Sequence, residues 1–307
     1  MLVTAFILNA FAASPTGGNP AGVVLRADDL TDRQMQRIAT RLGFSETAFV
    51  QSSRRANWRV RFFTPKNEVN LCGHATIATF YLLNKSSTFL SGVLHPDRKV
   101  LDKKKLAKPG TYRQETKAGI LKVTIDKDGA VYMDQPMPKF SRKIHHAAIA
   151  KALNIQAHDL DTALPVQLVS TGGLDMYVPV RRLTTLLALR PNRKQLIAMS
   201  RQYGIEGFCV FTMETKKSAT AHYRSFAPAV GINEDPACGV EAGALGCYLL
   251  KYGKVSKKES QKMVFETGYA IRRPSEIRVQ LATRNATITR VRVGGMAANI
   301  KKIKIRA

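Results

Sequence analysis

The sequence is poor in cysteine and lacks the spacings that cysteine-based sites require. Its 307 residues contain four cysteines, at positions 72, 209, 238 and 247, and none of them forms a CxxC pair. This number and spacing exclude a disulfide framework and a CxxC-type zinc or thiol redox site. Few, scattered cysteines are typical of a protein in a reducing compartment, so we expect a cytoplasmic location.

Long apolar runs are also missing. No stretch approaches the 18 or so consecutive apolar residues that a membrane-spanning helix requires. The opening segment 1–14 is apolar, but no Lys or Arg precedes it and Asn9 interrupts it. We therefore interpret this segment as a β-strand rather than a signal peptide, and we expect no association with a membrane.

Acidic residues are scarce. The chain has 22 Asp and Glu against 48 Lys and Arg, which gives a net charge of +26. Such a charge attracts anions, nucleic acid among them. However, the basic residues are spread along the chain and no recognised nucleic-acid motif accompanies them, so a generally basic, solvated surface is the favoured explanation. A non-catalytic or nucleic-acid-binding basic protein remains the alternative class of function.

Several common catalytic motifs are absent. The sequence contains no HExxH, no GxGxxG after a strand, no GxxxxGK[ST] and no GxSxG. The six histidines are dispersed, apart from the pair His145 and His146. We therefore expect no metal ion, no dinucleotide and no other cofactor.

Hydrophobic periodicity predicts a duplicated α+β protein. The length and a hydrophobic content of 45% favour two domains. The spacing of apolar residues predicts helices at 31–42, 73–83, 145–153, 193–203 and 239–251, and alternating segments predict strands between them. The basic stretch 95–117 has the character of a linker between two domains.

The strongest sign of duplication is a short internal repeat. FTP at 63–65 precedes Cys72 and Gly73, and FAP at 226–228 precedes Cys238 and Gly239. Each Cys-Gly pair opens an apolar helix that contains Tyr-Leu-Leu. Two similar halves predict a cleft between them that receives both helix N-termini.

The paired Cys-Gly sequences are candidates for a substrate site. A helix N-terminus offers free backbone N–H groups and a partial positive charge, which suit a substrate carboxylate and favour a thiolate. Gly73 and Gly239 would allow an anion to approach closely. Cys72 and Cys238 are therefore candidates for acid/base or nucleophilic chemistry, although most free cysteines are simply buried small apolar residues. The other two cysteines are given that structural role.

Four ionisable residues lie close to these positions or in apolar surroundings. Glu46 occurs in the apolar segment 44–50, where desolvation should raise its pKa and make it a general base. Its simpler explanation is an exposed residue on the polar face of a strand. His74 could shuttle a proton and Asp235 stands just before the second Cys-Gly pair, although both could serve as ordinary helix-start residues. Glu241 is most simply explained by the dipole of its helix.

A set of short motifs occurs in order along the chain: NAF at 9–11, GNPAGVV at 18–24, SETAF at 45–49, FTP at 63–65, LCGHAT at 71–76, STG at 170–172, EDPACG at 234–239, AGALG at 242–246 and VRVGG at 291–295. Together these motifs resemble the phenazine-biosynthesis (PhzF-type) isomerase family, which is related to diaminopimelate epimerase and proline racemase. Because they occur in order over nearly the whole chain, the resemblance is more specific than any single short pattern.

The resemblance implies a diaminopimelate epimerase-like duplicated fold, in which two pseudo-symmetric domains each wrap a barrel-like β-sheet around a central helix. We place the domains at 1–112 and 113–295, with a strand at about 296–307 packing back on the first. The resemblance implies a homodimer and a cofactor-free site for a small carboxylate. It implies roles for Glu46 as base, for His74 and Asp235 as its partners, and for a set of residues lining the site, namely Gly18, Asn19, Gly73, Gly239 and Val240.

Two departures from the family pattern leave alternatives open. Val240 stands where the phenazine enzyme has a serine after its DPxxG motif, which puts the phenazine substrate in doubt. Cys72 and Cys238 stand where the related racemases carry two catalytic cysteines. A two-cysteine racemase or epimerase is therefore the runner-up to an isomerase that moves a proton between carbons.

Overall fold

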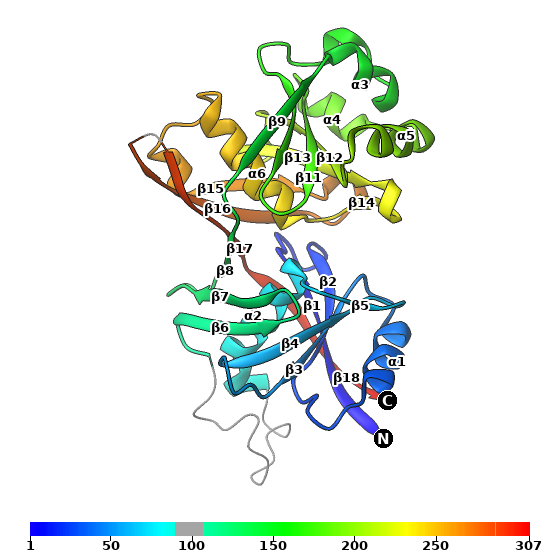
Figure 1. Ribbon diagram of the computed structural model, residues 1–307, viewed down its shortest axis with the longest axis vertical. Coiled ribbons are helices and arrows are strands. Elements are labelled where there is room, and N and C mark those ends of the chain that lie inside the picture. The colour runs from blue at the N-terminus through cyan, green and yellow to red at the C-terminus, as the bar shows by residue number, and fades with distance from the viewer. Residues whose placement is uncertain (90–106, 286) are drawn as a thin grey trace. The chain divides into compact units, whose positions relative to one another are not determined.

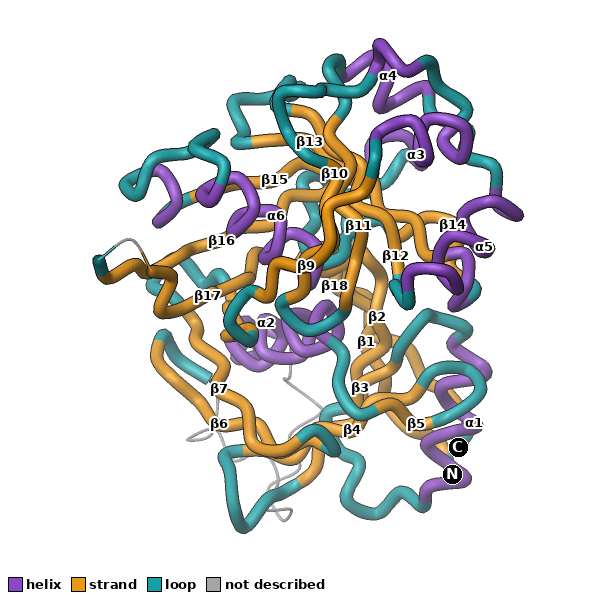
Figure 2. The backbone as a smooth tube through the Cα atoms, turned by 45° about the horizontal axis from the view of Figure 1, so that its top comes forward, coloured by secondary structure: helices purple, strands orange, loops and turns teal. Residues whose placement is uncertain are grey.

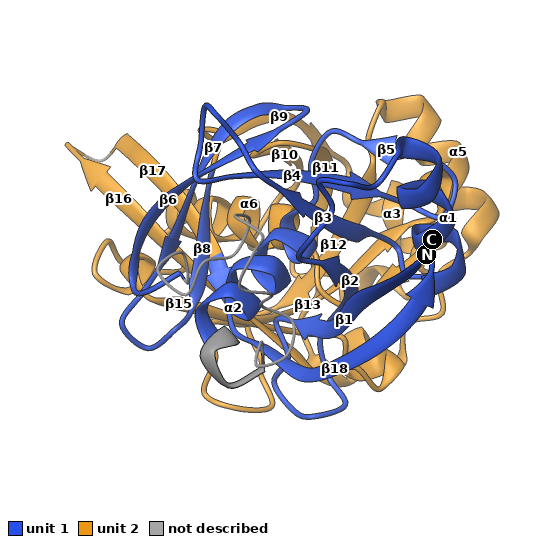
Figure 3. Ribbon diagram, turned by 90° about the horizontal axis from the view of Figure 1, so that it is seen from below, with its two compact units in different colours: residues 1–134, 294–307 blue, residues 135–293 orange. Residues whose placement is uncertain are grey.

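The computed structural model describes residues 1–89, 107–285 and 287–307, and these residues divide into two compact units. Unit 1 comprises Met1–Asp134 and Gly294–Ala307, and unit 2 comprises Gln135–Val293. Figure 3 colours the two units separately and shows that the last segment of the chain belongs with the first. The predicted division at 112/113 lies 22 residues before this boundary, because three strands that follow residue 109 pair within the sheet of unit 1.

The sheet of unit 1 has the strand order β18-β1-β2-β3-β4-β6-β7-β8, with short β5 also pairing with β4. Neighbours are antiparallel except for the parallel pairs β2–β3 and β4–β6. The strands are β1 (Leu2–Ala10), β2 (Asn19–Val24), β3 (Thr47–Gln51), β4 (Trp58–Phe63), β5 (Glu68–Val69), β6 (Gly110–Thr116), β7 (Gly119–Ile125), β8 (Val131–Gln135) and β18 (Ala297–Arg306).

Two helices pack on opposite faces of this sheet. The long apolar helix α2 (Gly73–Phe89) contacts β1, β2 and β3, and it also contacts β7 and β18 near the two ends of the strand order. The sheet therefore curves around α2, which Figures 1 and 2 show among the strands of its unit. The amphipathic helix α1 (Asp32–Leu42) buries Met35, Ile38 and Ala39 on the other face, against Val3 and Phe49 among other residues.

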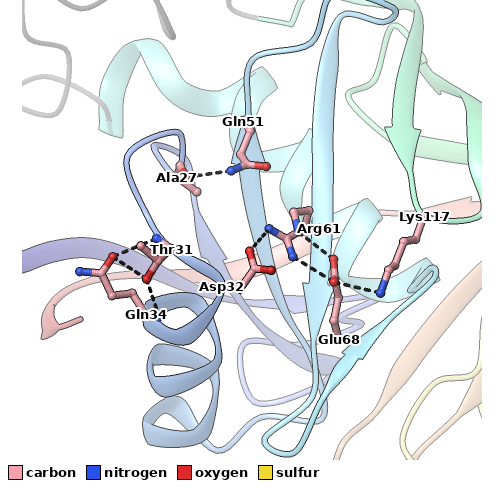
Figure 4. A network of polar contacts seen from close by, with 8 residues as sticks. All are labelled: Ala27, Thr31, Asp32, Gln34, Gln51, Arg61, Glu68 and Lys117. Atoms are coloured by element: carbon pink, nitrogen blue, oxygen red, sulfur yellow. Dashed lines mark hydrogen bonds and ion pairs between the residues drawn. The ribbon is translucent and has the colours of Figure 1, made fainter.

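Both ends of α1 (Asp32–Leu42) carry capping residues. The Thr31 side chain accepts the backbone N–H of Gln34 and the Gln34 side chain accepts the backbone N–H of Thr31, which together form a capping box. Gly43 ends the helix in the left-handed conformation, with φ of 68°. Arg61 on β4 donates to Asp32 in the first turn at 2.6 Å and also to Glu68 on β5, as Figure 4 shows. This charge network ties α1 to the sheet.

Unit 2 repeats the same order and the same pattern of directions. Its sheet runs β9-β10-β11-β12-β13-β15-β16, with parallel pairs at β11–β12 and β13–β15 and short β14 pairing with β13. The strands are β9 (Lys139–Ile144), β10 (Val166–Ser170), β11 (Leu174–Pro179), β12 (Gly207–Thr212), β13 (Ala221–Ala227), β14 (Ile232–Asp235), β15 (Met263–Thr267), β16 (Ser275–Arg284) and β17 (Thr287–Gly295). The duplicated α+β architecture expected from the sequence is therefore confirmed.

The helices of unit 2 also correspond to those of unit 1. The apolar helix α6 (Gly239–Lys251) contacts β10 and β16, as α2 contacts its own sheet. The remaining helical segments are α3 (His146–Leu153), α4 (Leu183–Ala188), α5 (Arg193–Tyr203) and the 3₁₀ turns Ala157–Asp159, Pro228–Val230, Glu259–Gln261 and Tyr269–Ile271. Side chains of α3, α4 and α5 form one hydrophobic cluster with β10 to β13. No helix among the described residues is long and apolar enough to cross a bilayer.

The predicted linker at 95–117 is wrong where the structure describes it. Residues 95–106 lie outside the described part of the chain, but Gly110–Thr116 forms β6, which pairs with β4 and β7. The predicted strand 45–50 also begins later, at Thr47, so that Glu46 lies directly before β3.

Candidate active site

Glu46 is held in place by the sheet of unit 1. Its backbone carbonyl accepts the N–H of Gly22 at 3.3 Å, which extends the parallel pairing of β2 and β3 by one residue. Helix α1 ends at Gly43 and β3 begins at Thr47, so Glu46 lies just before the N-terminal end of β3. Its side chain is 22% exposed, and it is therefore neither fully buried nor an ordinary surface residue.

Cys72 and His74 meet at the start of α2. Cys72 is only 7% exposed and directly precedes the first helical residue, Gly73. Its carbonyl accepts both the backbone N–H and the hydroxyl of Thr76, at 3.1 and 2.8 Å, which fixes the first turn. The thiol sulfur lies 3.4 Å from Nδ1 of His74. The sequence placed these two residues together, and the structure shows that their side chains touch.

The fold brings Glu46 to this pair across 26 residues of sequence. Nε2 of His74 lies 3.5 Å from Oε2 of Glu46 and 3.4 Å from the hydroxyl of Ser45. One donor atom each from Glu46, Cys72 and His74 lies within 4.8 Å of the others. The imidazole therefore stands between a carboxylate and a thiol, an arrangement that can pass a proton or stabilise the charged carboxylate. Ser45 is a site residue that the sequence analysis did not single out, although it directly precedes Glu46.

Gly18 and Asn19 lie at the same end of the neighbouring strand. Asn19 is the first residue of β2 and is 4% exposed. Gly18 has φ of 84°, and a Cβ built on it would lie 2.6 Å from the carbonyl oxygen of Ala10. Only glycine fits this conformation and this close approach, so Gly18 shapes the loop that leads into β2.

In unit 2, Asp235, Cys238, Gly239 and Val240 follow one another from β14 into α6. The Asp235 carboxylate accepts the backbone N–H of Ala237 at 2.8 Å, which closes a tight turn before the helix. Cys238 is the N-cap of α6, and its carbonyl accepts the hydroxyl of buried Tyr223 at 2.9 Å. The four predicted residues of this half are therefore brought together in one short segment.

The first turn of α6 is anchored to its unit by polar side chains. Gln135 donates from Nε2 to the carbonyl of Gly239 at 2.8 Å. Thr171, in the STG motif, donates its hydroxyl to Gln135 and also contacts the carbonyl of Val240. Because these bonds hold the helix start against β8 and the loop after β10, the backbone N–H groups of this turn keep a fixed direction.

Cys238 is in surroundings that oppose its ionisation. Burial raises the pKa of the Cys238 thiol well above its ordinary value, and the nearby carboxyl groups of Glu241 and Asp235 raise it further. The thiolate is the reactive form of cysteine in proton transfer and in nucleophilic attack. The helix N-terminus, which we expected to favour thiolate, is outweighed here by desolvation and by the neighbouring acids.

Glu241, which we explained by the dipole of its helix, does lie in the first turn of α6, but its side chain is buried. It is 2% exposed, and burial, with the nearby Asp175 as the next cause, raises its pKa well above the usual range. Burial likewise raises the pKa of Asp175 to about 7. A Cβ built on Gly207 would lie 3.2 Å from a carboxyl oxygen of each of these acids, which shows that both side chains converge behind α6. Sequence analysis did not single out Asp175, because a single Asp within a strand does not reveal the acidic residues that lie near it in space.

Comparison with known proteins agrees with this architecture. Residues 8–302 match the family model described as phenazine biosynthesis-like protein. An uncharacterized isomerase, YfhB, from Bacillus subtilis is 36% identical over 278 residues, covering 89% of this chain and 88% of the relative. A trans-2,3-dihydro-3-hydroxyanthranilate isomerase from Pseudomonas chlororaphis is 30% identical over 296 residues, covering 94% of both chains.

Solved structures give the same result. The crystal structure of a PhzF-family phenazine biosynthesis protein from Bacillus anthracis matches with a TM-score of 0.85 and 29% identity, and each chain is covered completely. A hydroxyproline epimerase from Agrobacterium vitis matches with a TM-score of 0.57 and 11% identity over 99% of this chain and 92% of that one, a likeness of fold alone. From the matched residues and these relatives, the chain belongs to the phenazine biosynthesis-like, PhzF-type family of isomerases.

Proposed function

We propose that this protein is a cofactor-independent isomerase that moves a proton between carbons of a small carboxylate substrate, with Glu46 as the base. The observation that carries the proposal is that the Glu46 carboxylate lies 3.5 Å from Nε2 of His74, just before the start of β3 in unit 1. A carboxylate that is partly exposed can reach a substrate C–H group, while the adjacent imidazole stabilises whichever protonation state Glu46 takes.

In the proposed reaction, Glu46 removes a proton from one carbon and returns it to another. The electron pair left on the substrate develops negative charge, which backbone N–H groups at the starts of α2 and α6 are suited to stabilise. Gly73 and Gly239 leave these N–H groups accessible to the substrate. Asp235 is the proposed proton partner.

The alternative two-cysteine racemase is disfavoured by the surroundings of Cys238. In that mechanism one thiolate removes an α-proton while the other thiol supplies one from the opposite face. The raised pKa of Cys238 makes it a poor thiolate base near neutral pH. Glu46, by contrast, has an imidazole beside it. This contrast supports the carboxylate as the base.

Val240 bears on the substrate class. The relative from Pseudomonas chlororaphis is named for trans-2,3-dihydro-3-hydroxyanthranilate, a carboxylate that also carries a hydroxyl group. Val240 offers an apolar side chain at the start of α6, at the position where the phenazine enzyme has a serine. We therefore propose a small carboxylate substrate with an apolar group, or no hydroxyl group, at the corresponding place.

The test is solvent isotope exchange. The protein would be incubated in deuterium oxide with a panel of amino acids, hydroxy acids and dihydro-hydroxyanthranilate, and deuterium entering carbon would be measured by mass spectrometry. We expect incorporation at a carbon that changes its bonding, and we expect Glu46→Gln to lower the rate by about two to four orders of magnitude.

The controls separate the base from the fold. Glu276→Gln removes a surface carboxylate that pairs with Lys217 at 3.6 Å, and this variant should exchange at the wild-type rate. A Glu46→Gln variant that keeps full exchange, together with a Cys238→Ser variant that loses it, would replace the proposed mechanism with the two-cysteine one.

A further inference from the structure

The cluster of Glu46, Cys72 and His74 combines three different kinds of donor atom at one point. A carboxylate oxygen, an imidazole nitrogen and a thiol sulfur lie within 4.8 Å of one another. We propose that this cluster binds a thiophilic divalent cation of the Zn²⁺ type. Zn²⁺ accepts these three ligand types together, whereas Mg²⁺ and Ca²⁺ require oxygen ligands.

Two of the three distances among the donor atoms are close to the edges of a zinc tetrahedron. With Zn–N and Zn–O bonds of about 2.0 Å and a Zn–S bond of about 2.3 Å, tetrahedral angles place the nitrogen about 3.3 Å from the oxygen and about 3.5 Å from the sulfur. In the structure, Nε2 of His74 lies 3.5 Å from Oε2 of Glu46 and 4.0 Å from Sγ of Cys72. The edges that share Nε2 therefore differ from the zinc values by about half an ångström or less, which small side-chain rotations can supply.

The cluster also has the exposure that such a site needs. Cys72 is 7% exposed, whereas the side chains of His74 and Glu46 are 11% and 22% exposed. All three ligands are thus largely sheltered, and Glu46 is the most accessible of them. Three protein ligands with one position left for water or a small anion is the pattern of zinc sites that are not closed structural centres.

Two of the three ligands are held by backbone structure. Cys72 is fixed by the bonds from Thr76 to its carbonyl, and the backbone of Glu46 is fixed by its bond from Gly22. Ordered ligands of this kind lose little conformational freedom when an ion binds. We expected no metal because the histidines are dispersed along the sequence. The sequence alone does not show that Glu46 lies against Cys72 and His74 in the folded protein.

Ion binding would have a direct consequence for the reaction. The ion would displace the thiol proton of Cys72 and occupy the oxygen atoms with which Glu46 is proposed to act. Bound Zn²⁺ and proton transfer by Glu46 would then exclude each other. Only this consequence rests on the proposed function, since ion binding to the resting protein requires no substrate.

The experiment is calorimetric titration of the whole chain, freed of metal by a chelator, with Zn²⁺ alone. We expect one ion per chain, and we expect Cys72→Ala, His74→Asn and Glu46→Gln each to weaken binding by at least about tenfold. Titration with Co²⁺ should produce a sulfur-to-cobalt charge-transfer absorption that is missing in Cys72→Ala.

The matched control is His158→Gln. His158 has a side chain that is 83% exposed and lies 4.0 Å from Asp159, which makes it a typical place for adventitious binding. This variant should bind Zn²⁺ as the wild type does, and circular dichroism should show that all four variants are folded. The proposal is overturned if the three cluster variants bind Zn²⁺ with unchanged stoichiometry and affinity, or if His158→Gln abolishes the binding.

Discussion

The surroundings of individual carboxyl groups in this protein shift their pKa values in opposite directions. In unit 1, hydrogen bonds from Arg61 hold the pKa of Glu68 below its ordinary value. In unit 2, burial together with the charge of Glu206 raises the pKa of Asp175 to about 7. Asp175 therefore stays protonated at a mildly acidic pH at which exposed carboxyl groups are charged.

Asp175 should make the stability of unit 2 depend on pH. In the unfolded chain Asp175 titrates near 3.8, and in the folded protein near 7, so between these values only the folded state keeps the proton. Its contribution to stability is full below about pH 4 and is lost as the pH rises to 7, by up to about 1.4 kcal/mol per pH unit. Asp175→Asn, which stays neutral, should flatten this decline when unfolding midpoints are measured from pH 4 to 7.

The control for Asp175→Asn is a variant that removes an exposed carboxyl group. Asp29 is exposed in unit 1, and Asp29→Asn should leave the pH profile of stability as it is in the wild type. An Asp175→Asn profile as steep as that of the wild type would mean that Asp175 is charged in the folded protein.

At the level of elements, the loop that carries Asp235 is shaped by a distant glycine in the same unit. Gly268 follows β15 with φ of 75°, and a Cβ at this position would lie 2.7 Å from the carbonyl oxygen of Pro236. That Cβ would lie still closer to the carbonyl of Arg273. Both obstacles are backbone atoms, which cannot turn aside as a flexible side chain can.

Gly268→Ala should therefore destabilise unit 2 and displace the Asp235 segment. Gly253 is the matched control, because its φ is 64° but a Cβ there meets nothing within 4 Å. Gly253→Ala should lower the free energy of unfolding by about 1 kcal/mol, because alanine disfavours the left-handed conformation. Gly268→Ala should lower it by about 1 to 3 kcal/mol more, because its Cβ would overlap backbone atoms. Chemical unfolding of both variants would measure the difference, and equal costs would contradict the steric argument.

Elements with strong local signals were predicted accurately from sequence. The start and end of α1 follow from Thr31 and Gly43, and the helix at Gly239–Lys251 follows from its apolar composition. The strand β6 was missed because its sequence, GTYRQET, is polar, and the residues that it buries are Gln114 and Thr116 rather than apolar ones. Hydrophobic periodicity cannot detect a strand whose inward side chains are polar.

The candidate site was predictable to the extent that motifs are local. Cys72 and His74 share one motif, so the sequence places them together, whereas the contact of Glu46 with His74 was supplied by family resemblance and is created by the sheet. The burial of Glu241 was not predicted, because a position in the first turn of a helix does not show which way its side chain faces. Long-range contacts and the direction of burial are properties of the fold that no single segment contains.

On the scale of the whole molecule, unit 1 is completed only by the last strand of the chain. β18 lies antiparallel to β1 along almost its entire length, and Ile303 and Ile305 pack against the cluster of α1 and the sheet. Arg37 and Arg41 of α1 donate to the carbonyls of Ala307 and Arg306. Residues separated in the sequence by the whole of unit 2 therefore form one core.

A charge placed on the inward face of β18 should consequently destabilise unit 1, although the change lies near residue 300. Ile303→Asp would bury a carboxylate in the cluster with Val3 and Met35, which we expect to cost about 2 to 4 kcal/mol. Lys302→Asp, one residue away on the exposed face of the same strand, should cost less than about 0.5 kcal/mol. Limited proteolysis with identification of the cut sites would locate the loosened region. Cleavage in Ile303→Asp should fall within residues 1–134 or 294–307, and cleavage confined to residues 135–293 would contradict the assignment of β18 to the core of unit 1.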